Sequence, residues 1–207
     1  MRSLKLKSDI KTRETALQVQ SKLLPLLFKG LDENRRVTLL NIGPAAPETV
    51  EFFSQFKCRL CFTDLYSELI PLDQNTDLEE QAMKQQLQTL FSFPADTQFD
   101  ICLFWDTLNY LNAPALRAFS KALQPFIHKN TQAHGFVKFK TTTQLAKQQF
   151  GIHQTDQLSI REQENQALAY HPHSQAELQK LLHGFTINKG TLLPDARLEI
   201  LLRAKRI

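Results

Sequence analysis

The sequence predicts an α/β protein built on a doubly wound, mostly parallel β-sheet. Two apolar runs, residues 37–42 and 99–105, have the character of buried strands, and a helical pattern follows each of them. Strands that alternate with helices favour a parallel sheet covered on both faces. Two further strand-like runs, 185–193 and 197–203, predict an antiparallel hairpin near the end of the chain.

The change from strand to turn to helix is clearest in residues 37–47. An apolar and β-branched run from Val37 to Ile42 is followed by Gly43, which can supply a tight turn. Pro47 suits the first turn of the next helix, because the N–H that proline lacks would be unpaired there. We expect this turn to lie at the edge of the sheet where doubly wound folds bind ligands.

The remaining elements are predicted from periodicity and capping residues. The expected helices span residues 13–29 (kinked or split at Pro25), 47–56, 74–89, 112–127 and 174–182, and the other expected strands span 58–63 and 136–140, with a weak strand or turn near 90–93.

Length and composition predict one globular domain over residues 1–207. Within it we expect residues 1–34 to form an N-terminal helical extension and residues 141–173 to form an insertion that covers the substrate. No apolar run approaches the roughly 20 residues that a membrane span needs. The three cysteines are too few for a disulfide framework. We therefore expect a cytoplasmic protein.

The first 36 residues are basic, with nine Lys or Arg against four acidic residues. Such an arm can bind an acidic partner or nucleic acid, although a solvated face is the commoner case. No aromatic residue precedes Phe28, which argues against a surface for base stacking. We expect any protein partner to bind at the N-terminal helix.

Residues 37–47 resemble the first motif of the class I S-adenosylmethionine-dependent methyltransferases, an acid followed by glycines at alternating positions. Asn41 stands where the acid belongs, Gly43 keeps the first glycine, and Ala45 and Pro47 replace the later ones. The order of the remaining elements is also similar to that of this family. The resemblance implies a seven-stranded, Rossmann-like sheet closed by an antiparallel hairpin, with S-adenosylmethionine as cofactor.

Several candidate site residues follow strands whose carboxyl ends should meet at one mouth of the sheet. The resemblance implies that Asp64, after the second strand, binds the cofactor ribose; a turn cap is the alternative. Residues 99–111 resemble the family's fourth motif. An adenine slot is implied near Phe91, for which core packing is the alternative. The expected cofactor-binding residues are Asn41, Gly43, Ala45, Asp64, Phe91 and Trp105.

Methyl transfer from a sulfonium is an in-line displacement, so positioning can supply most of the catalysis. For a hydroxyl acceptor a base is also useful, and the candidates are Asp106, Tyr110 and His134. The chain has no Asn/Asp-Pro-Pro-Tyr sequence at this strand end and no Pro-Cys pair. These absences argue against methylation of adenine or glutamine amino groups and of cytosine C5.

Three rival sites are less well supported by the sequence: a cysteine pair, a histidine pair and a nicotinamide dinucleotide site. Cys58 and Cys61 lie three residues apart on an expected strand and so point to opposite faces. No cluster of cysteines or acids accompanies His171 and His173 nearby in the sequence, so we expect no metal. A nicotinamide dinucleotide needs backbone N–H groups around its pyrophosphate, and two prolines in residues 43–47 remove N–H groups.

Two functional hypotheses follow from these residues. The first is a methyltransferase acting on a small-molecule or protein acceptor, which Asp64 and Asp106 favour. The second is an inactive protein of the same fold that serves as a binding or scaffold subunit, which Asn41, Ala45 and Pro47 favour.

Overall fold

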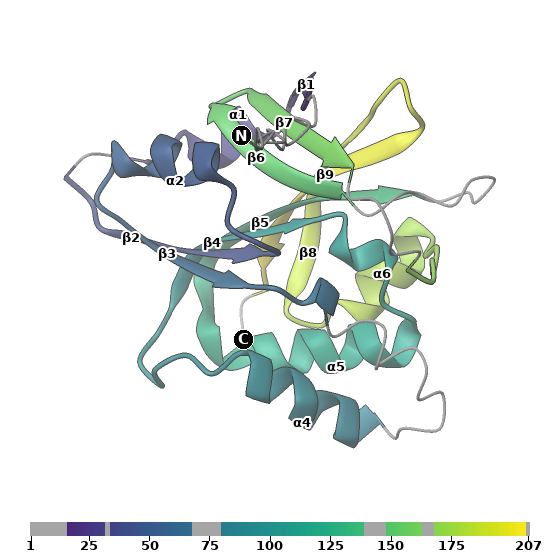
Figure 1. Cartoon of the computed structure of the whole chain (residues 1–207). Helices are drawn as coiled ribbons and strands as arrows, with labels where there is room; N and C mark the ends of the chain where they lie inside the picture. Colours follow the sequence, from purple (N-terminus) through teal and green to yellow (C-terminus); the bar gives the residue numbers. More distant parts are fainter. Residues whose placement is uncertain (1–15, 32–33, 68–79, 139–147, 163–167, 206–207) are drawn as a thin grey trace, which may run out of the picture.

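The central element is a six-stranded sheet, seen in a computed structural model that describes residues 16–31, 34–67, 80–138, 148–162 and 168–205 (Figure 1). Its strand order is β3-β2-β4-β5-β9-β8. The first four strands are parallel, and β9 runs antiparallel to both of its neighbours. The strands are β2 (Val37–Ile42), β3 (Cys58–Thr63), β4 (Phe99–Trp105), β5 (Ile127–Lys138), β8 (Phe185–Leu192) and β9 (Arg197–Ala204).

Each face of the sheet has its own hydrophobic core. Helices α4, α5 and α6 cover one face, where Leu87, Leu116 and Leu178 belong to the same buried cluster (Figure 1). Helices α1 and α2 lie on the other face, and Leu27 and Phe52 belong to the second cluster. The helices are α1 (Leu24–Phe28), α2 (Pro47–Ser54), α4 (Glu80–Leu90), α5 (Ala113–Leu123) and α6 (Gln175–Leu181), with short 3-10 turns η1 (Thr107–Asn109) and η2 (Gln124–Phe126).

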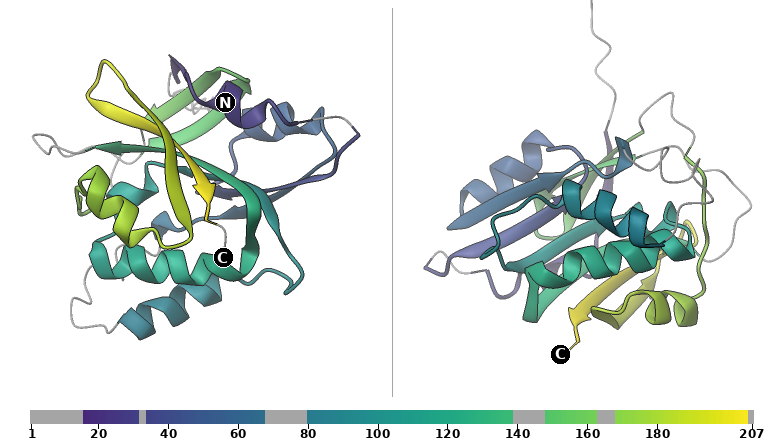
Figure 2. Two further views of the ribbon diagram at one scale, coloured as in Figure 1. Left: turned by 180° about the vertical axis from the view of Figure 1, so that it is seen from behind. Right: turned by 90° about the horizontal axis from the view of Figure 1, so that it is seen from below.

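A second, three-stranded antiparallel sheet joins two segments that lie far apart in the sequence. It consists of β1 (Leu17–Gln20), β7 (Gln157–Glu162) and β6 (Gln148–Gln154), in that order. Figure 2 shows β1 beside the β6–β7 hairpin, on the face that carries α1 and α2. We call this unit the cap sheet. It contains described parts of both the N-terminal extension and the insertion that the sequence predicts.

The structure corrects the prediction of a helix over residues 13–29. Residues 17–20 form β1, which pairs with β7, and of the described residues 16–29 only 24–28 are helical. Pro25 is the second residue of this short helix, whose first turn accepts proline without losing a hydrogen bond. The local apolar period suits a helix, but pairing with a distant strand decides the conformation of residues 17–20.

Three other predictions differ from the structure. The described residues contain six strands in the central sheet, where seven are expected, because residues 90–93 form no strand. Instead α4 ends at Leu90, and Phe91 packs edge-on against Phe119 of α5. The helix expected over 112–127 ends at Leu123. The strand expected over 136–140 begins much earlier, because β5 starts at Ile127. Some predictions include residues that lie outside the described ones, namely 1–15, 32–33, 74–79, 139–147 and 163–167.

The end of the chain forms the expected pair of antiparallel strands, β8 and β9, with a register shift between Ile187 and Lys189. In the part of the chain that the structure describes, no helix is both long enough and apolar enough to cross a membrane.

Candidate functional site

The carboxyl ends of β2 and β4 meet at the point where the strand order reverses. In doubly wound sheets this switch point forms the ligand-binding crevice. Gly43 follows β2 there, with a φ of 111°, and its N–H donates to the Thr63 carbonyl of β3 at 2.7 Å. A Cβ at this position would lie 3.1 Å from Cε2 of Tyr66. Glycine is therefore required both by the backbone conformation and by the ring beside it.

Asn41 occupies the position where the family motif has an acid. It is buried, its Nδ2 donates to the Gly43 carbonyl at 3.2 Å, and its Oδ1 accepts from Trp105 Nε1 at 2.9 Å. An amide can donate and accept at once, whereas a carboxylate can only accept. The Asn41 amide thus both shapes the turn and joins the ends of β2 and β4.

Trp105, at the end of β4, is held in an unusual conformation. Its φ of 50° lies in the left-handed region, which costs a non-glycine residue about 1–3 kcal/mol. The indole stacks on Phe150 of the cap sheet, with ring centroids 5.1 Å apart and planes 3° from parallel. Together with the bond to Asn41, this stacking fixes the side chain across the mouth of the sheet. Phe150 lies in the polar insertion over residues 141–173 and is not among the site residues that the sequence predicts.

Asp106 is the buried acid of this mouth, with 1% of its surface exposed. It accepts hydrogen bonds from the hydroxyl groups of Tyr66 and Tyr110, the latter at 3.0 Å. Burial raises the pKa of Asp106 to about 6, although both phenol hydrogen bonds oppose the rise. Burial, followed by the negative charge of Asp106, raises the pKa of both tyrosines, so each stays a protonated donor.

Two side-chain hydrogen bonds consequently cross the switch point. The Trp105–Asn41 bond spans it on one face of the sheet, and the Tyr66–Asp106 bond spans it on the other. Tyr66 and Trp105 are 1% and 2% exposed. In this conformation the protein's own aromatic rings close the crevice beside Gly43.

The other expected cofactor-binding residues lie in different surroundings. Asp64 is exposed directly after β3, and Ala45 is exposed in the turn before α2. Phe91 is buried in the core, 5.8 Å from Phe119 between ring centroids. Its neighbour Phe93 packs on Phe99, the first residue of β4. The ring contacts of Phe91 are therefore with core residues on the sheet face that carries α4 and α5.

Of the three candidate bases, Asp106 and Tyr110 are hydrogen-bonded to each other, whereas His134 lies apart from both. His134 is fully buried, belongs to β5 and packs its ring against Trp105 and Phe136. These two neighbours belong to the core on the α1 face, whereas Tyr110 belongs to the core on the opposite face. His134 therefore shares no hydrogen-bond network with the other two candidate bases in the described structure.

His134 instead takes part in an anchor for α1. Its Nε2 lies 2.8 Å from Oε1 of Glu199 on β9. Glu199 also accepts from the Ser21 hydroxyl and from the backbone N–H groups of Lys22 and Leu23. Burial would raise the pKa of Glu199, but the hydrogen bonds from His134 and Ser21 outweigh it, so the pKa falls. The carboxylate fastens the start of α1 to the sheet.

A second carboxylate fastens the cap sheet beside the Gly43 turn. Glu48, in the first turn of α2, accepts from the Ser159 hydroxyl and from the Arg161 guanidinium. A Cβ on Gly151 would collide with this carboxylate, so glycine allows the close approach of β6. Burial opposes ionisation of Glu48, yet its bonds to Arg161 and Ser159 lower the pKa. The cap sheet is thus tied to the helix that starts at the switch point.

Sequence reasoning missed Tyr66, Phe150 and the two anchoring glutamates. Tyr66 lies two residues after Asp64, so its nearness to the strand end was a usable signal. No local signal marks the others, because their partners lie more than 40 residues away. Among the residues that the structure describes, no group of three or more His, Cys, Asp or Glu side chains could hold a metal ion.

Comparison with solved structures shows which fold this is. An S-adenosylmethionine-dependent methyltransferase from Clostridium acetobutylicum ATCC 824 matches with a TM-score of 0.51 and 12% identity, over 91% of this chain and 93% of that chain. The PH0226 protein from Pyrococcus horikoshii OT3 matches with a TM-score of 0.50 and 12% identity, over 88% of both chains. The chain spans about half of the pyocyanin biosynthetic protein PhzM, covering 54% of it at a TM-score of 0.45, with 12% identity over 88% of this chain.

Neither a protein-family model nor the sequence of a curated protein matches the chain. The structural likeness therefore concerns the fold. The chain has an α/β fold with a mostly parallel central sheet, as S-adenosylmethionine-dependent methyltransferases have.

Proposed function

We propose that the chain is a methyltransferase that binds S-adenosylmethionine at the switch point and methylates a small-molecule or protein acceptor. The main observation behind this proposal is that the Gly43 turn and Asp64 lie at the carboxyl ends of neighbouring strands. Both follow neighbouring parallel strands at the mouth of the sheet, and the Asp64 carboxylate is exposed there. The fold shared with a methyltransferase of known cofactor type supports the choice of ligand.

The residues present fit S-adenosylmethionine once the Tyr66 ring has moved. Gly43 has no side chain, which allows a ligand to approach the backbone closely, and Asp64 can accept hydrogen bonds from two ribose hydroxyls. Tyr66 lies against Gly43, so its ring has to turn away from the crevice when the cofactor enters. Breaking the Tyr66–Asp106 bond would accompany that movement.

When bound, the cofactor would supply an electrophilic methyl group to a nucleophilic acceptor. The protein's part is to hold the acceptor in line and to receive a proton where the acceptor is a hydroxyl. Asp106 suits the second task, because its raised pKa of about 6 makes it a better base than an ordinary carboxylate while leaving it mainly ionised at neutral pH. Tyr110, which donates to Asp106, would hold the carboxylate in position.

A second candidate function is favoured by the closed crevice. The side chains of Tyr66 and Trp105 fill the space at the ends of β2 and β4. Tyr66 is bonded to Asp106, and Trp105 is bonded to Asn41 and stacked on Phe150. A protein that keeps this closure permanently would serve as a non-catalytic binding or scaffold subunit.

Thermal unfolding with S-adenosylmethionine or S-adenosylhomocysteine separates the two functions. Ligand at about 100 times its Kd stabilises a protein by roughly 2.7 kcal/mol, which for a chain of this size raises Tm by roughly 5–10 °C. The methyltransferase proposal predicts such a rise. An unchanged Tm at millimolar ligand would refute it and would support the non-catalytic function.

Paired variants test the assigned place of the cofactor. Asp64→Ala should abolish the ligand-induced rise, whereas Asp96→Ala, which removes another exposed aspartate before β4, should leave it unchanged. A rise of equal size in both variants would show that Asp64 does not hold the cofactor.

A further inference from the structure

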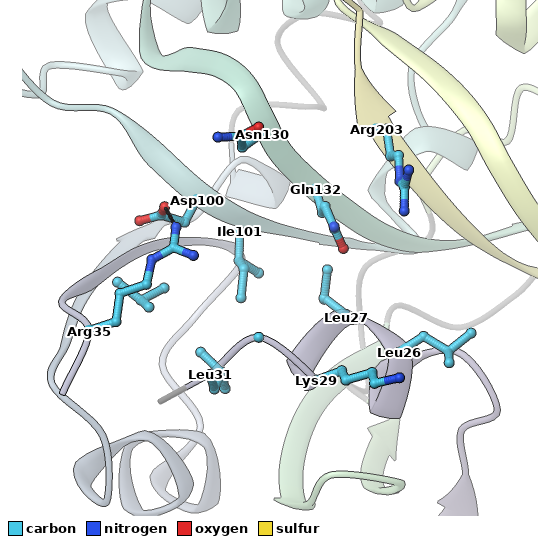
Figure 3. A pocket seen from close by; sticks show the side chains of 12 residues that line it. Leu26, Leu27, Lys29, Leu31, Arg35, Asp100, Ile101, Asn130, Gln132 and Arg203 are labelled. Atoms are coloured by element: carbon cyan, nitrogen blue, oxygen red, sulfur yellow. Dashed lines mark hydrogen bonds and ion pairs between the residues drawn. The ribbon is translucent and has the colours of Figure 1, made fainter. Parts of the chain in front are cut away.

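A hollow of about 420 Å³ lies at the end of the sheet opposite to the crevice (Figure 3). Its walls are α1 with the residues just after it, the first residues of β2 and β4, and parts of β5 and β9. Its volume falls within the range of small-molecule sites. Because it lies at the amino ends of the parallel strands, it is separate from the place proposed for S-adenosylmethionine.

The strand register places a row of three different side chains across the hollow. Ile101 of β4 pairs with Gln132 of β5, and Gln132 pairs with Arg203 of β9. Residues directly paired on adjacent strands share a face of the sheet. Figure 3 shows Gln132 and Arg203 pointing toward α1. The row thus runs from an apolar group through an amide to a guanidinium.

The hollow carries an excess of positive charge. Its acid, Asp100, is already satisfied, with one oxygen 2.7 Å from Arg35 Nη2 and the other accepting the Thr38 N–H at 2.9 Å. Lys29, just after α1, and Arg203 form no ion pair with any residue that the structure describes. Among the residues that the structure describes, two cationic groups from different elements therefore border one hollow, and no described acid is left to balance them.

Apolar side chains form the rest of the wall. Leu27, Val37 and Ile101 are buried, and Leu31 is half-buried beside them. A simple inorganic anion would leave this apolar surface unused. A neutral hydrocarbon would leave the two cations without a counter-charge.

We propose that this hollow binds an organic anion with a hydrocarbon body, of the alkyl carboxylate class. The carboxylate pairs with the Arg203 guanidinium, whose planar donors match its two oxygens, and Lys29 adds a second positive charge. The Gln132 amide can donate a further hydrogen bond. The hydrocarbon body lies against Leu27 and Ile101.

The first experiment titrates octanoate, below the concentration at which it forms micelles, into the ¹⁵N-labelled full chain. The expected result is saturable shifts in the amide resonances of Gly30, Gln132 and Arg203. Octanol, which lacks the charge, and acetate, which lacks the hydrocarbon chain, should each bind at least about tenfold more weakly. Octanol binding as tightly as octanoate would refute the ionic part of the proposal, and octanoate shifts confined to the crevice residues would refute its location.

Charge-removing variants test the two cations separately. Arg203→Gln and Lys29→Gln should each weaken octanoate binding by roughly tenfold, because each removes one charge-assisted contact. Lys189→Gln removes an exposed lysine on β8 outside the hollow and should change nothing. Amide spectra of the ligand-free variants report whether each still folds, and either folded variant suffices for the test. Unchanged affinity in a folded Arg203→Gln or Lys29→Gln chain would overturn the assignment.

Discussion

The buried Asp106 predicts an unusual dependence of stability on pH. Its carboxyl has a higher pKa in the folded chain, about 6, than the ordinary value of 3.8. A group with a raised pKa binds its proton more tightly when the protein is folded. Its stabilising contribution is therefore fully present below about pH 4 and is lost as the pH rises through about 6.

The size of this effect follows from the shift. A difference of about two pKa units corresponds to roughly 3 kcal/mol between the two ends of that pH range. Replacement by Asn removes the titration but keeps the shape of the side chain. The free energy of unfolding of the wild type minus that of Asp106→Asn should therefore fall by roughly 3 kcal/mol between pH 4 and pH 7.5.

Urea unfolding followed by tryptophan fluorescence is a suitable assay, because Trp105 is the only tryptophan in the chain and lies beside the site. Both proteins are measured at several pH values across the range. Asp96→Asn, at an exposed aspartate, controls for the general loss of one negative charge. Parallel pH profiles for the wild type and Asp106→Asn would refute the argument that burial raises this pKa.

Two further substitutions test the packing around the site. Glu199→Gln should lower the free energy of unfolding by about 3–5 kcal/mol, because it breaks a buried carboxylate–His134 contact; in urea unfolding a loss no larger than that of the exposed Glu51→Gln would contradict the anchoring role. Gly43→Ala should cost about 1–3 kcal/mol, because alanine at a φ of 111° is strained. Gly30→Ala is its control, since a Cβ there meets nothing within 4 Å, and equal stability of the two alanine variants would show that the turn relaxes freely.

The structure agrees with the sequence most closely where local chemistry decides the backbone. Residues 37–42 form a strand, Gly43 forms a left-handed turn, and Pro47 begins the helix, as the apolar run and the two special residues predict. The strand over 99–105 has the predicted bounds as well. Such features depend on neighbours within a few residues, so the sequence alone carries their signal.

Residues 17–20 show why other elements were predicted wrongly. Leu17 and Val19 fit a helical period as readily as a strand, because a window of four residues does not distinguish the two. Pairing with Gln157 to Ile160, more than 130 residues away, settles the matter in favour of a strand. Tertiary structure therefore decides between strand and helix at residues 17–20.

From the sequence alone one could predict the doubly wound sheet. One could also predict that Asp64, Asp106 and Tyr110 follow strands whose carboxyl ends lie at the same edge of that sheet. Only the tertiary structure decided that Tyr66 lies on Gly43 and that His134 lies on the opposite face, bonded to Glu199. The physical reason is the separation along the sequence of the residues that interact. Backbone turns and amphipathic periods are local, whereas the closure of a crevice depends on the register of strands and on hydrogen bonds between side chains that only folding brings together.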